Sequence, residues 1–248
     1  MSEDVRTKLQ ALSSGQSMRK RQSPKRKKST RKEQVQKPKV EIQEVSHEID
    51  SVEEHANVLF KPNEGPQTEF LAASEREVLY GGSAGGGKSY AMLADPLRYM
   101  GHPQFSGLLL RHTTEELREL IFKSQELYPK IWPGIKWSER KMQWTAPSGA
   151  RLWMSYLDRD EDVLRYQGLA FSWIGFDELT QWATPYAWNY MRSRLRSTAT
   201  DLPIFMRATT NPGGRGHHWV KKMFIDPSPY NRSFDATDID TTEVLRYP

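Results

Sequence analysis

Eight residues in the first half of the chain have the types and spacing that a phosphate-binding site requires. The segment 82–89 reads Gly-Ser-Ala-Gly-Gly-Gly-Lys-Ser and fits the pattern G-x-x-x-x-G-K-[ST] in full. Its glycines let backbone N–H groups approach phosphate oxygens, where side chains would collide. Lys88 supplies a positive charge for the β- and γ-phosphates, and Ser89 supplies a hydroxyl ligand for Mg²⁺. We therefore predict nucleotide binding here, against the alternative of a glycine-rich surface turn. The glycines assigned to it are Gly82, Gly85, Gly86 and Gly87.

Two adjacent acids follow an apolar segment later in the chain. Residues 171–176 predict a buried strand, and Asp177 and Glu178 come directly after it. Because ligands bind at the C-terminal ends of parallel strands, Asp177 is predicted to share a Mg²⁺ ion with Ser89. Glu178 is predicted to orient or deprotonate the water that attacks the γ-phosphate. Such a pair alone can simply begin a helix, but together with the phosphate loop it indicates a hydrolysing ATPase.

Further residues extend the predicted nucleotide site. Gln67 begins a predicted helix, and its amide has the donor and the acceptor that the N6 and N7 edge of adenine needs; an ordinary polar residue at a helix start is the equal alternative. Thr209, Thr210 and Asn211 lie at the end of a later strand and are predicted to sense the γ-phosphate, unless the Asn-Pro-Gly-Gly run is a plain turn. His217 and His218 are adjacent and point apart, which indicates a helix start rather than a metal site.

From about Pro62 onward, short apolar runs typical of strands alternate with segments whose apolar residues recur at the spacing of a helix. Strands are predicted at 77–80, 107–110, 171–176 and 204–209, and helices at 88–100, 114–128, from about 185, and at 218–224. Alternating aromatic residues between 137 and 156, around a Pro-Ser-Gly turn, predict a β-hairpin. This order predicts an α/β fold of the P-loop NTPase class (RecA/ASCE-like), in which helices flank a mainly parallel sheet that carries a β-hairpin insertion.

Composition excludes several other classes of protein. The 248 residues include no cysteine, so disulfides, thiolate metal sites and cysteine nucleophiles are ruled out. No run of 18 apolar residues is present, and the N-terminal residues lack the pattern of a secretory signal. We therefore expect a soluble, intracellular protein without a membrane partner.

The basic residues are concentrated at one end of the chain. Residues 1–40 carry 13 Lys or Arg and 3 Asp or Glu, whereas the whole chain has 36 and 31. This stretch predicts a disordered basic tail, which either binds nucleic acid through its charge or is merely solvated. Residues 41–61 predict an acidic linker and 62–226 the ATPase domain. Residues 227–248 predict a C-terminal linker or the start of a missing nuclease domain.

Three motifs together resemble a known family. They are the Walker A loop with its strand at 80–89, the Walker B segment Ile-Gly-Phe-Asp-Glu-Leu-Thr-Gln at 174–181, and the run from Thr-Asn-Pro-Gly-Gly to His-His-Trp-Val-Lys at 210–221. In this combination the chain is similar to the ATPase domain of the terminase large subunit of tailed bacteriophages, from about Gly65 to Ile225. The second and third motifs are the specific ones, since Walker motifs alone also occur in helicases.

The resemblance implies a function and partners. The function is Mg²⁺-dependent ATP hydrolysis that powers translocation of double-stranded viral DNA into a procapsid. The implied cofactors are ATP and Mg²⁺. The implied partners are double-stranded DNA, the portal protein and the small terminase subunit, with a homo-oligomeric ring when docked. The implied location is the host cell cytoplasm, transiently at the procapsid portal.

The sequence also departs from the family pattern. The family continues into an RNase H-like nuclease domain whose clustered carboxylates bind metal. Asp235, Asp238 and Asp240 lie in a polar segment without a predicted strand, so we do not expect them to form that metal site, nor this chain to be a nuclease.

An arginine is also missing from the phosphate loop, where many terminases have one. Residues 83–86 contain none, so a catalytic arginine must come from elsewhere. The resemblance to a family of ring motors implies that a neighbouring subunit supplies it. Arg165 is the first choice, because it precedes the strand that carries the catalytic acid. The reserves are Arg111, Arg194 and Arg196. The alternative for Arg165 is a surface side chain paired with Glu161, four residues earlier.

Two other functions stay open. A helicase or another DNA translocase of related fold would have the same Walker motifs, although such helicases usually need two ATPase units and this chain holds one. A nucleotide-gated docking scaffold with little turnover would also bind the nucleotide. ATP turnover with and without duplex DNA separates these functions.

Overall fold

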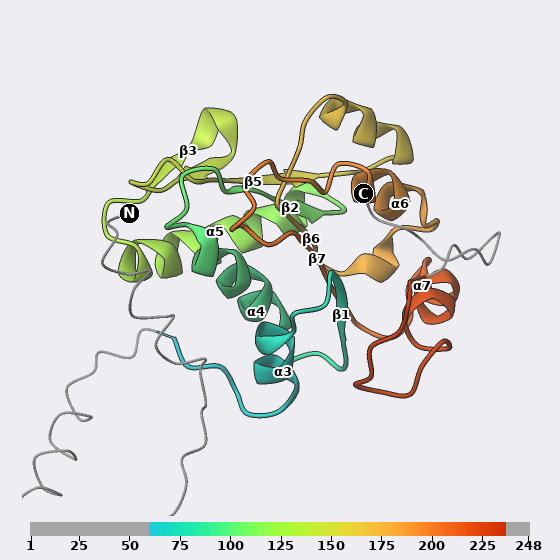
Figure 1. Ribbon diagram of the computed structural model, residues 1–248. Helices are drawn as coiled ribbons and strands as arrows, with labels where there is room; N and C mark the ends of the chain where they lie inside the picture. The colour runs from blue at the N-terminus through green and yellow to red at the C-terminus, as the bar shows by residue number, and fades with distance from the viewer. Residues whose placement is uncertain (1–59, 237–248) are drawn as a thin grey trace, which may run out of the picture. The chain divides into compact units, whose positions relative to one another are not determined.

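A computed structural model describes residues 60–236. The predicted basic tail, all but the end of the predicted acidic linker, and residues 237–248 lie outside the described residues. Residues 60–236 form a seven-stranded sheet with helices on both faces (Figure 1), which confirms the predicted α/β class. Within this range, no helix has both the length and the apolar character that crossing a membrane requires.

The elements follow the predicted order. The strands are β1 (Glu77–Gly81), β2 (Ser106–Arg111), β3 (Lys136–Ser138), β4 (Gln143–Thr145), β5 (Arg151–Tyr156), β6 (Trp173–Phe176) and β7 (Phe205–Thr210). The α-helices are α3 (Pro66–Ala72), α4 (Lys88–Ala94), α5 (Thr114–Ile131), α6 (Tyr186–Arg192) and α7 (His217–Phe224). The 3₁₀ helices are η1 (Asp95–Tyr99), η2 (Glu139–Lys141), η3 (Asp160–Tyr166) and η4 (Leu179–Gln181).

The strand order is β1-β7-β6-β2-β5-β4-β3. The first five strands in this order are parallel, and β4 and β3 continue the sheet in antiparallel pairing. The predicted hairpin is β4–β5, and it extends the main sheet, because β5 also pairs in parallel with β2. The C-terminal ends of β1, β7 and β6 therefore lie side by side, which brings the predicted catalytic segments together.

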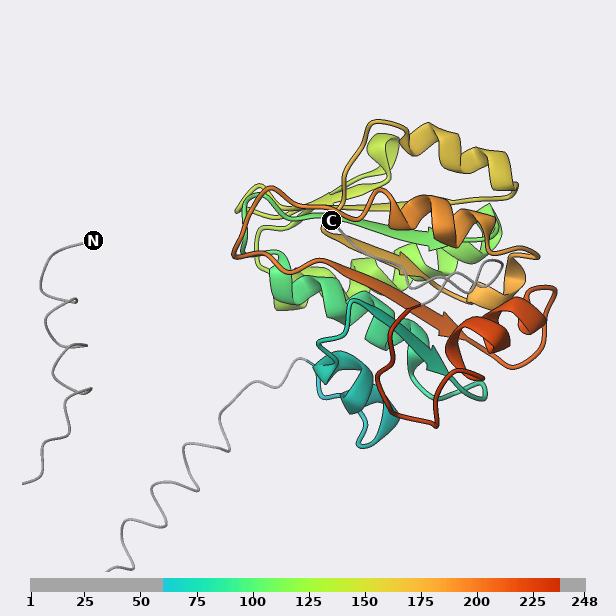
Figure 2. The same cartoon turned by 45° about the vertical axis from the view of Figure 1, so that its right-hand side comes forward.

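Two hydrophobic cores lie on opposite faces of the sheet. One packs α3, α4 and α5 against the sheet, and the other packs η3, α6 and α7 (Figures 1 and 2). Side chains of β2 alternate between them: Leu109 belongs to the first core, and Leu108 and Leu110 belong to the second. This double burial explains why the central strands read as continuous apolar runs in the sequence.

Two helices end at residues other than the predicted ones. The helix predicted over 88–100 is α-helical only to Ala94 and continues as the 3₁₀ helix η1, because Pro96 has no N–H for an α-helical bond. Helix α5 begins with a capping box in which Thr113 and Glu116 bind each other's backbone N–H. It ends at Ile131, three residues beyond the predicted end at Tyr128.

Trp173 fixes the phosphate-loop helix α4 against the sheet. Its ring covers Gly175, where a Cβ would collide with the ring and come within 2.7 Å of Met92 Sδ from α4. Its Nε1 donates to Asp95 Oδ2 at 2.7 Å, directly after α4. Asp95 is fully buried and also lies 3.5 Å from the guanidinium of Arg207 on β7. Strands β6 and β7 are thereby linked to one end of α4.

Candidate functional site

The phosphate loop connects β1 to α4, as its sequence predicts. Gly82, Gly85 and Gly87 have φ values of 147°, 84° and 73°, in the region that residues with a Cβ rarely adopt. Lys88 is buried, and its Nζ donates to the backbone oxygens of Gly82 at 3.1 Å and Ser83 at 2.6 Å. The lysine thus spans the loop in the position from which it can reach a phosphate oxygen.

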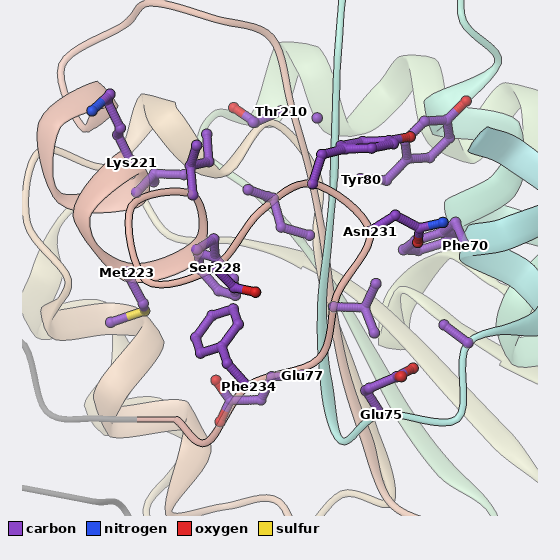
Figure 3. Close-up of a pocket in the computed structure, with 18 of the residues that line it drawn as sticks. Phe70, Glu75, Glu77, Tyr80, Thr210, Lys221, Met223, Ser228, Asn231 and Phe234 are labelled. Atoms are coloured by element: carbon purple, nitrogen blue, oxygen red, sulfur yellow. The ribbon is translucent and has the colours of Figure 1, made fainter.

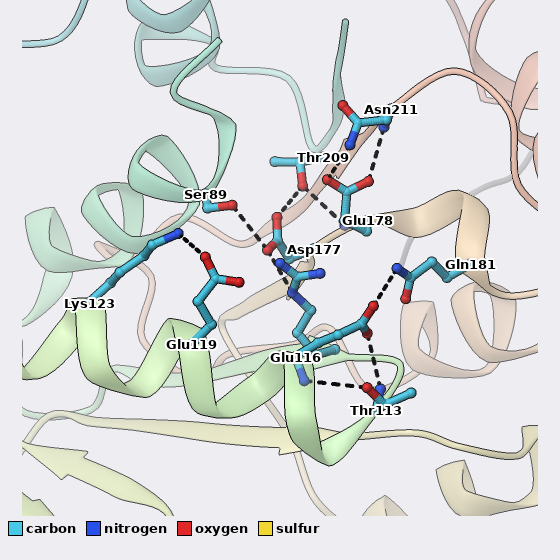
Figure 4. Close-up of polar contacts among 11 residues, drawn as sticks. Ser89, Thr113, Glu116, Glu119, Lys123, Asp177, Glu178, Gln181, Thr209 and Asn211 are labelled. Atoms are coloured by element: carbon cyan, nitrogen blue, oxygen red, sulfur yellow. Dashed lines mark hydrogen bonds and ion pairs between the residues drawn. The ribbon is translucent and has the colours of Figure 1, made fainter. Parts of the chain in front are cut away.

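Asp177 lies opposite this loop at the end of β6 (Figure 4). Its Oδ2 is 3.4 Å from Ser89 Oγ, and its Oδ1 accepts a hydrogen bond from Thr209 Oγ1. The guanidinium of Arg111, at the end of β2, lies 2.9 Å from Asp177 Oδ2. The buried carboxylate is therefore balanced by a buried cation.

The oxygen atoms of Ser89 and Asp177 suit a Mg²⁺ ion. A hydroxyl and a carboxylate converge on the same point, and Mg²⁺ prefers oxygen ligands, typically one or two from the protein with the rest from phosphates and water. These two residues fit the predicted metal site, and the ion would replace part of the charge that Arg111 now supplies to Asp177.

Glu178 accepts two hydrogen bonds from the residue that follows β7, the strand that pairs with β6. Asn211, after β7, donates to it twice: the backbone N–H to Oε2 at 3.1 Å and Nδ2 to Oε1 at 2.8 Å. Glu178 itself has φ 61°, so the backbone turns sharply after Asp177. Burial raises the pKa of Glu178, and the charge of neighbouring Asp177 raises it further. This carboxylate therefore takes up a proton more readily than an exposed glutamate.

The last two residues of β7 and the residue that follows them contact different groups. Thr209 contacts Asp177, and Asn211 contacts Glu178, whereas Thr210 faces Thr180 of η4 at 2.8 Å between hydroxyl oxygens. Alternation along a strand explains this division. We predicted the run from Thr209 to Asn211 as the γ-phosphate sensor. The structure places Thr209 and Asn211 at the two acids, whereas the hydroxyl of Thr210 faces Thr180.

Gln67 lies beside the phosphate loop, but its polar groups are bound within the protein. Its Nε2 donates to Gly87 O at 2.9 Å, and its Oε1 accepts from the Asn63 backbone N–H at 2.6 Å. The side chain is 3% exposed. Each polar atom of the amide keeps one more hydrogen-bonding position, a second N–H on Nε2 and a second lone pair on Oε1, so the adenine contact stays a prediction.

Arg165 lies away from the phosphate loop of its own chain. Its Nη2 donates to Tyr156 O at 2.8 Å, at the end of β5. In the strand order β5 is four places from β1, or about 19 Å at normal strand spacing. The alternative, a surface arginine paired within its own short helix, is confirmed in kind but not in partner, since the ion pair is with Asp162 at 3.5 Å and not with Glu161. A 3₁₀ helix has three residues per turn, which places residues three apart on one face.

The reserve arginines differ in position. Arg111 contacts Asp177 directly. The backbone groups of Arg194 and Arg196 bond to Phe171, which precedes β6 and so lies at the opposite end of that strand from Asp177. Neither residue is therefore placed near the phosphate loop of its own chain.

The remaining predicted residues lie outside the cluster of acids. His217 Nδ1 accepts from the Gly213 backbone N–H at 3.2 Å, and His217 begins α7. Asp235 is exposed, and Asp238 and Asp240 lie outside the described residues.

A cavity of about 930 Å³ runs along the outer side of β1, between α3, α7 and residues 228–236 (Figure 3). Its walls include Phe70, Met223 and Phe234, and it reaches Gly81 and Gly82 at the start of the phosphate loop. Tyr80 lines the cavity with its ring, while its hydroxyl donates to Gly86 O at 2.6 Å. The cavity and the loop therefore share one side chain.

Known structures have a similar fold. The large terminase of a thermophilic bacteriophage matches with 18% identity and a TM-score of 0.53, over 67% of this chain and 43% of that one. The same terminase in complex with ADP matches with 18% identity and a TM-score of 0.52, over 66% and 42%. The ATPase domain of a Thermus phage large terminase matches with 13% identity and a TM-score of 0.47, over 66% and 70%. This chain thus spans less than half of the large terminase from the thermophilic phage.

A comparison of sequences places the chain in a family. No curated protein matches it. The model of the family described as "Terminase large subunit, T4likevirus-type, N-terminal" matches residues 79–244, a range that includes the phosphate loop, both acids and the segment after β7. The chain therefore belongs to the family of T4likevirus-type terminase large subunits and carries their N-terminal domain.

Proposed function

We propose that this chain is an ATPase that hydrolyses Mg²⁺-ATP to drive packaging of double-stranded viral DNA. The observation that carries the proposal is the contact of Ser89, which follows Lys88 at the start of α4, with Asp177 at the end of β6, directly before Glu178. The relative that was solved with ADP supports a nucleotide ligand. Family membership supports the packaging role, with DNA, a portal protein and a small terminase subunit as partners.

Each residue has a separate task in this proposal. Lys88 releases its two loop carbonyls and binds phosphate oxygens. Ser89 and Asp177 hold Mg²⁺, which neutralises charge on the phosphates. Glu178 accepts a hydrogen bond from the attacking water. Its oxygens have lone pairs beyond those used by Asn211, so Asn211 can keep the carboxylate oriented while the water is bound.

A ring of subunits would complete the site. Charge that develops on the γ-phosphate oxygens needs a further cation, and residues 83–86 provide none. We propose that Arg165 of a neighbouring subunit provides it, because in its own chain this arginine lies four strands from β1. The complex would act in the host cytoplasm, at the portal of a procapsid.

Two substitutions test the proposed reaction. Lys88→Ala should abolish nucleotide binding, because Lys88 interacts with the phosphates before the reaction. Glu178→Gln should bind normally and lose hydrolysis by a factor of roughly 100 or more, since it acts on the water. Calorimetric binding and steady-state turnover, with and without duplex DNA, measure both. Equal loss of binding in the two variants would contradict these roles, and negligible turnover of the unaltered protein under all conditions would favour a docking scaffold.

A further inference from the structure

The carboxylate oxygen proposed to hold Mg²⁺ already has a cation beside it. Nε of Arg111, at the end of β2, lies 2.9 Å from Asp177 Oδ2, and the same oxygen lies 3.4 Å from Ser89 Oγ. We infer that Arg111 competes with Mg²⁺ for this oxygen, so that the nucleotide-free protein excludes the ion and takes it up only together with a nucleotide. The inference rests on the proposed function, since it concerns how the metal enters and leaves the same site.

Burial makes this competition strong. Asp177 is fully buried and Arg111 is 7% exposed, so water screens little of the charge of either group. Mg²⁺ binds oxygen at about 2.1 Å. An ion at that distance from Asp177 Oδ2 would lie at most about 5 Å from Arg111 Nε, because the two distances meet at one oxygen. Two cations that close repel each other, so one of them binds Asp177 at the expense of the other.

The contact of the arginine depends on charge and can be released. Among the described residues, Nε of Arg111 is a buried nitrogen without a hydrogen-bond partner, so the ion pair lacks the alignment of a hydrogen bond. The carboxylate would stay in place, because Asp177 Oδ1 accepts from Thr209. Arg111 also has another acid within electrostatic range: Lys123 has the largest part in lowering the pKa of Glu119 on α5, and the charge of Arg111 adds a smaller effect (Figure 4).

A nucleotide changes the outcome of the competition. Its phosphates supply oxygen ligands to Mg²⁺ beyond the one or two that the protein provides, and their negative charge offsets the repulsion from Arg111. Arg111 then gives up Asp177. After hydrolysis and loss of the γ-phosphate, fewer phosphate oxygens and less negative charge remain, so the return of Arg111 to Asp177 favours departure of the ion with ADP. A single arginine thus couples the presence of the metal to that of the nucleotide.

Binding of Mn²⁺ to the nucleotide-free protein tests the inference, with electron paramagnetic resonance as the measurement, because Mn²⁺ takes the same oxygen ligands as Mg²⁺. Arg111→Met should bind Mn²⁺ more tightly than the unaltered protein by roughly 10-fold or more, since it removes a charge beside the ion. Adding Asp177→Asn to this variant should abolish the gain. The matched control is Arg98→Met, which removes a guanidinium from another fully buried carboxylate, that of Asp95 just beyond α4, and should bind Mn²⁺ as the unaltered protein does.

The opposite results are equally distinct. A folded Arg111→Met protein with unchanged Mn²⁺ affinity overturns the inference: the arginine is then structural if only the temperature of unfolding falls, and a phosphate ligand if metal-free ADP binds more weakly. If Arg111→Met does not fold, the unaltered protein decides, because Mn²⁺ that binds at Asp177 as tightly without ADP as with it overturns the inference.

Mg²⁺-ATP binding is first measured on the unaltered protein, so that two kinds of failure can be told apart. Absence of that binding overturns the proposed function. Normal Mg²⁺-ATP binding, without a gain in Mn²⁺ affinity in Arg111→Met, overturns the inference only.

Discussion

Glu178 is the residue whose surroundings bear most directly on chemistry. Burial and the charge of Asp177 both raise its pKa, and the backbone N–H of Asn211 acts in the other direction with a smaller effect. A general base works best when its pKa is near the working pH. The buried position thus makes Glu178 a stronger base than an exposed glutamate, while Asn211 keeps it in place.

The first prediction follows from this shift. Because the pKa of Glu178 is raised, the carboxylate is protonated at a higher pH than an ordinary glutamate, whose pKa is about 4.3. As the pH is lowered, kcat at saturating Mg²⁺-ATP should therefore decline with an apparent pKa above that value. Turnover between pH 4.5 and 8, with nucleotide affinity measured at each pH, provides the check. An apparent pKa at or below the ordinary value contradicts the prediction, and the residual rate of Glu178→Gln should lack this decline.

The residues of the site were predictable where a local motif defines them. Lys88, Ser89, Asp177 and Glu178 come from two short patterns whose strand context can be read from the sequence. Arg111 was predicted only as a reserve for the catalytic arginine of a neighbouring subunit, and no contact in the site was predicted for Tyr80. Their contacts with Asp177 and Gly86 depend on how the strands are arranged and on side-chain direction, which a single sequence does not show.

Among the elements, α4 and β6 are held together by one tight contact. Gly175→Ala should lower the free energy of unfolding by roughly 1–3 kcal/mol, because the added methyl group would overlap the Trp173 ring and approach Met92 Sδ at 2.7 Å. Gly101→Ala is the control, since its nearest neighbour is Trp132 Cη2 at 3.4 Å, and should change stability by less than about 0.5 kcal/mol. Chemical denaturation measures both, and equal losses would show that the contact is not the cause.

The types and the order of the helices and strands were predicted better than the residues at which they end. Double burial makes the central strands apolar throughout, so β2 and β6 stand out in the sequence. The conversion of the end of α4 to η1 at Pro96 was missed, although proline gives a direct reason for it. The pairing of β5 with β2 joins segments about 45 residues apart, and no local pattern specifies such a partner.

At the scale of the whole molecule, the proposed ring predicts shared active sites. Arg165→Ala should bind ATP normally and hydrolyse it poorly. A mixture of Arg165→Ala with Glu178→Gln should recover activity, because some interfaces then combine an intact arginine with an intact glutamate. Turnover of the mixture is compared with the sum of the separate variants, under conditions where rings form and exchange subunits. A mixture no more active than that sum would reject Arg165 as the residue supplied by the neighbour.

The charge of the N-terminal 40 residues predicts a salt effect. These residues, with 13 basic and 3 acidic side chains, are expected to supply much of the affinity for DNA of any sequence. Each neutralised phosphate contributes about −0.9 to the slope of log affinity against log salt on duplex DNA. Deleting residues 1–40 should therefore flatten that slope. An unchanged slope would instead assign DNA binding to the remaining part of the chain.

The adjacency of the first and last strands has a consequence for synthesis. Arg207 on β7 donates to Ala73 O, just before β1, across 134 residues of sequence. At 5–20 residues per second, the ribosome adds that length in on the order of ten seconds. Throughout that interval the strand that carries the phosphate loop lacks β7, its only partner within residues 60–236, and unpaired strands associate readily with other chains. The domain can therefore complete its nucleotide site only when β7 has been synthesised. A chain released before Thr210 would have the phosphate loop but not the residues of β7 that complete the site.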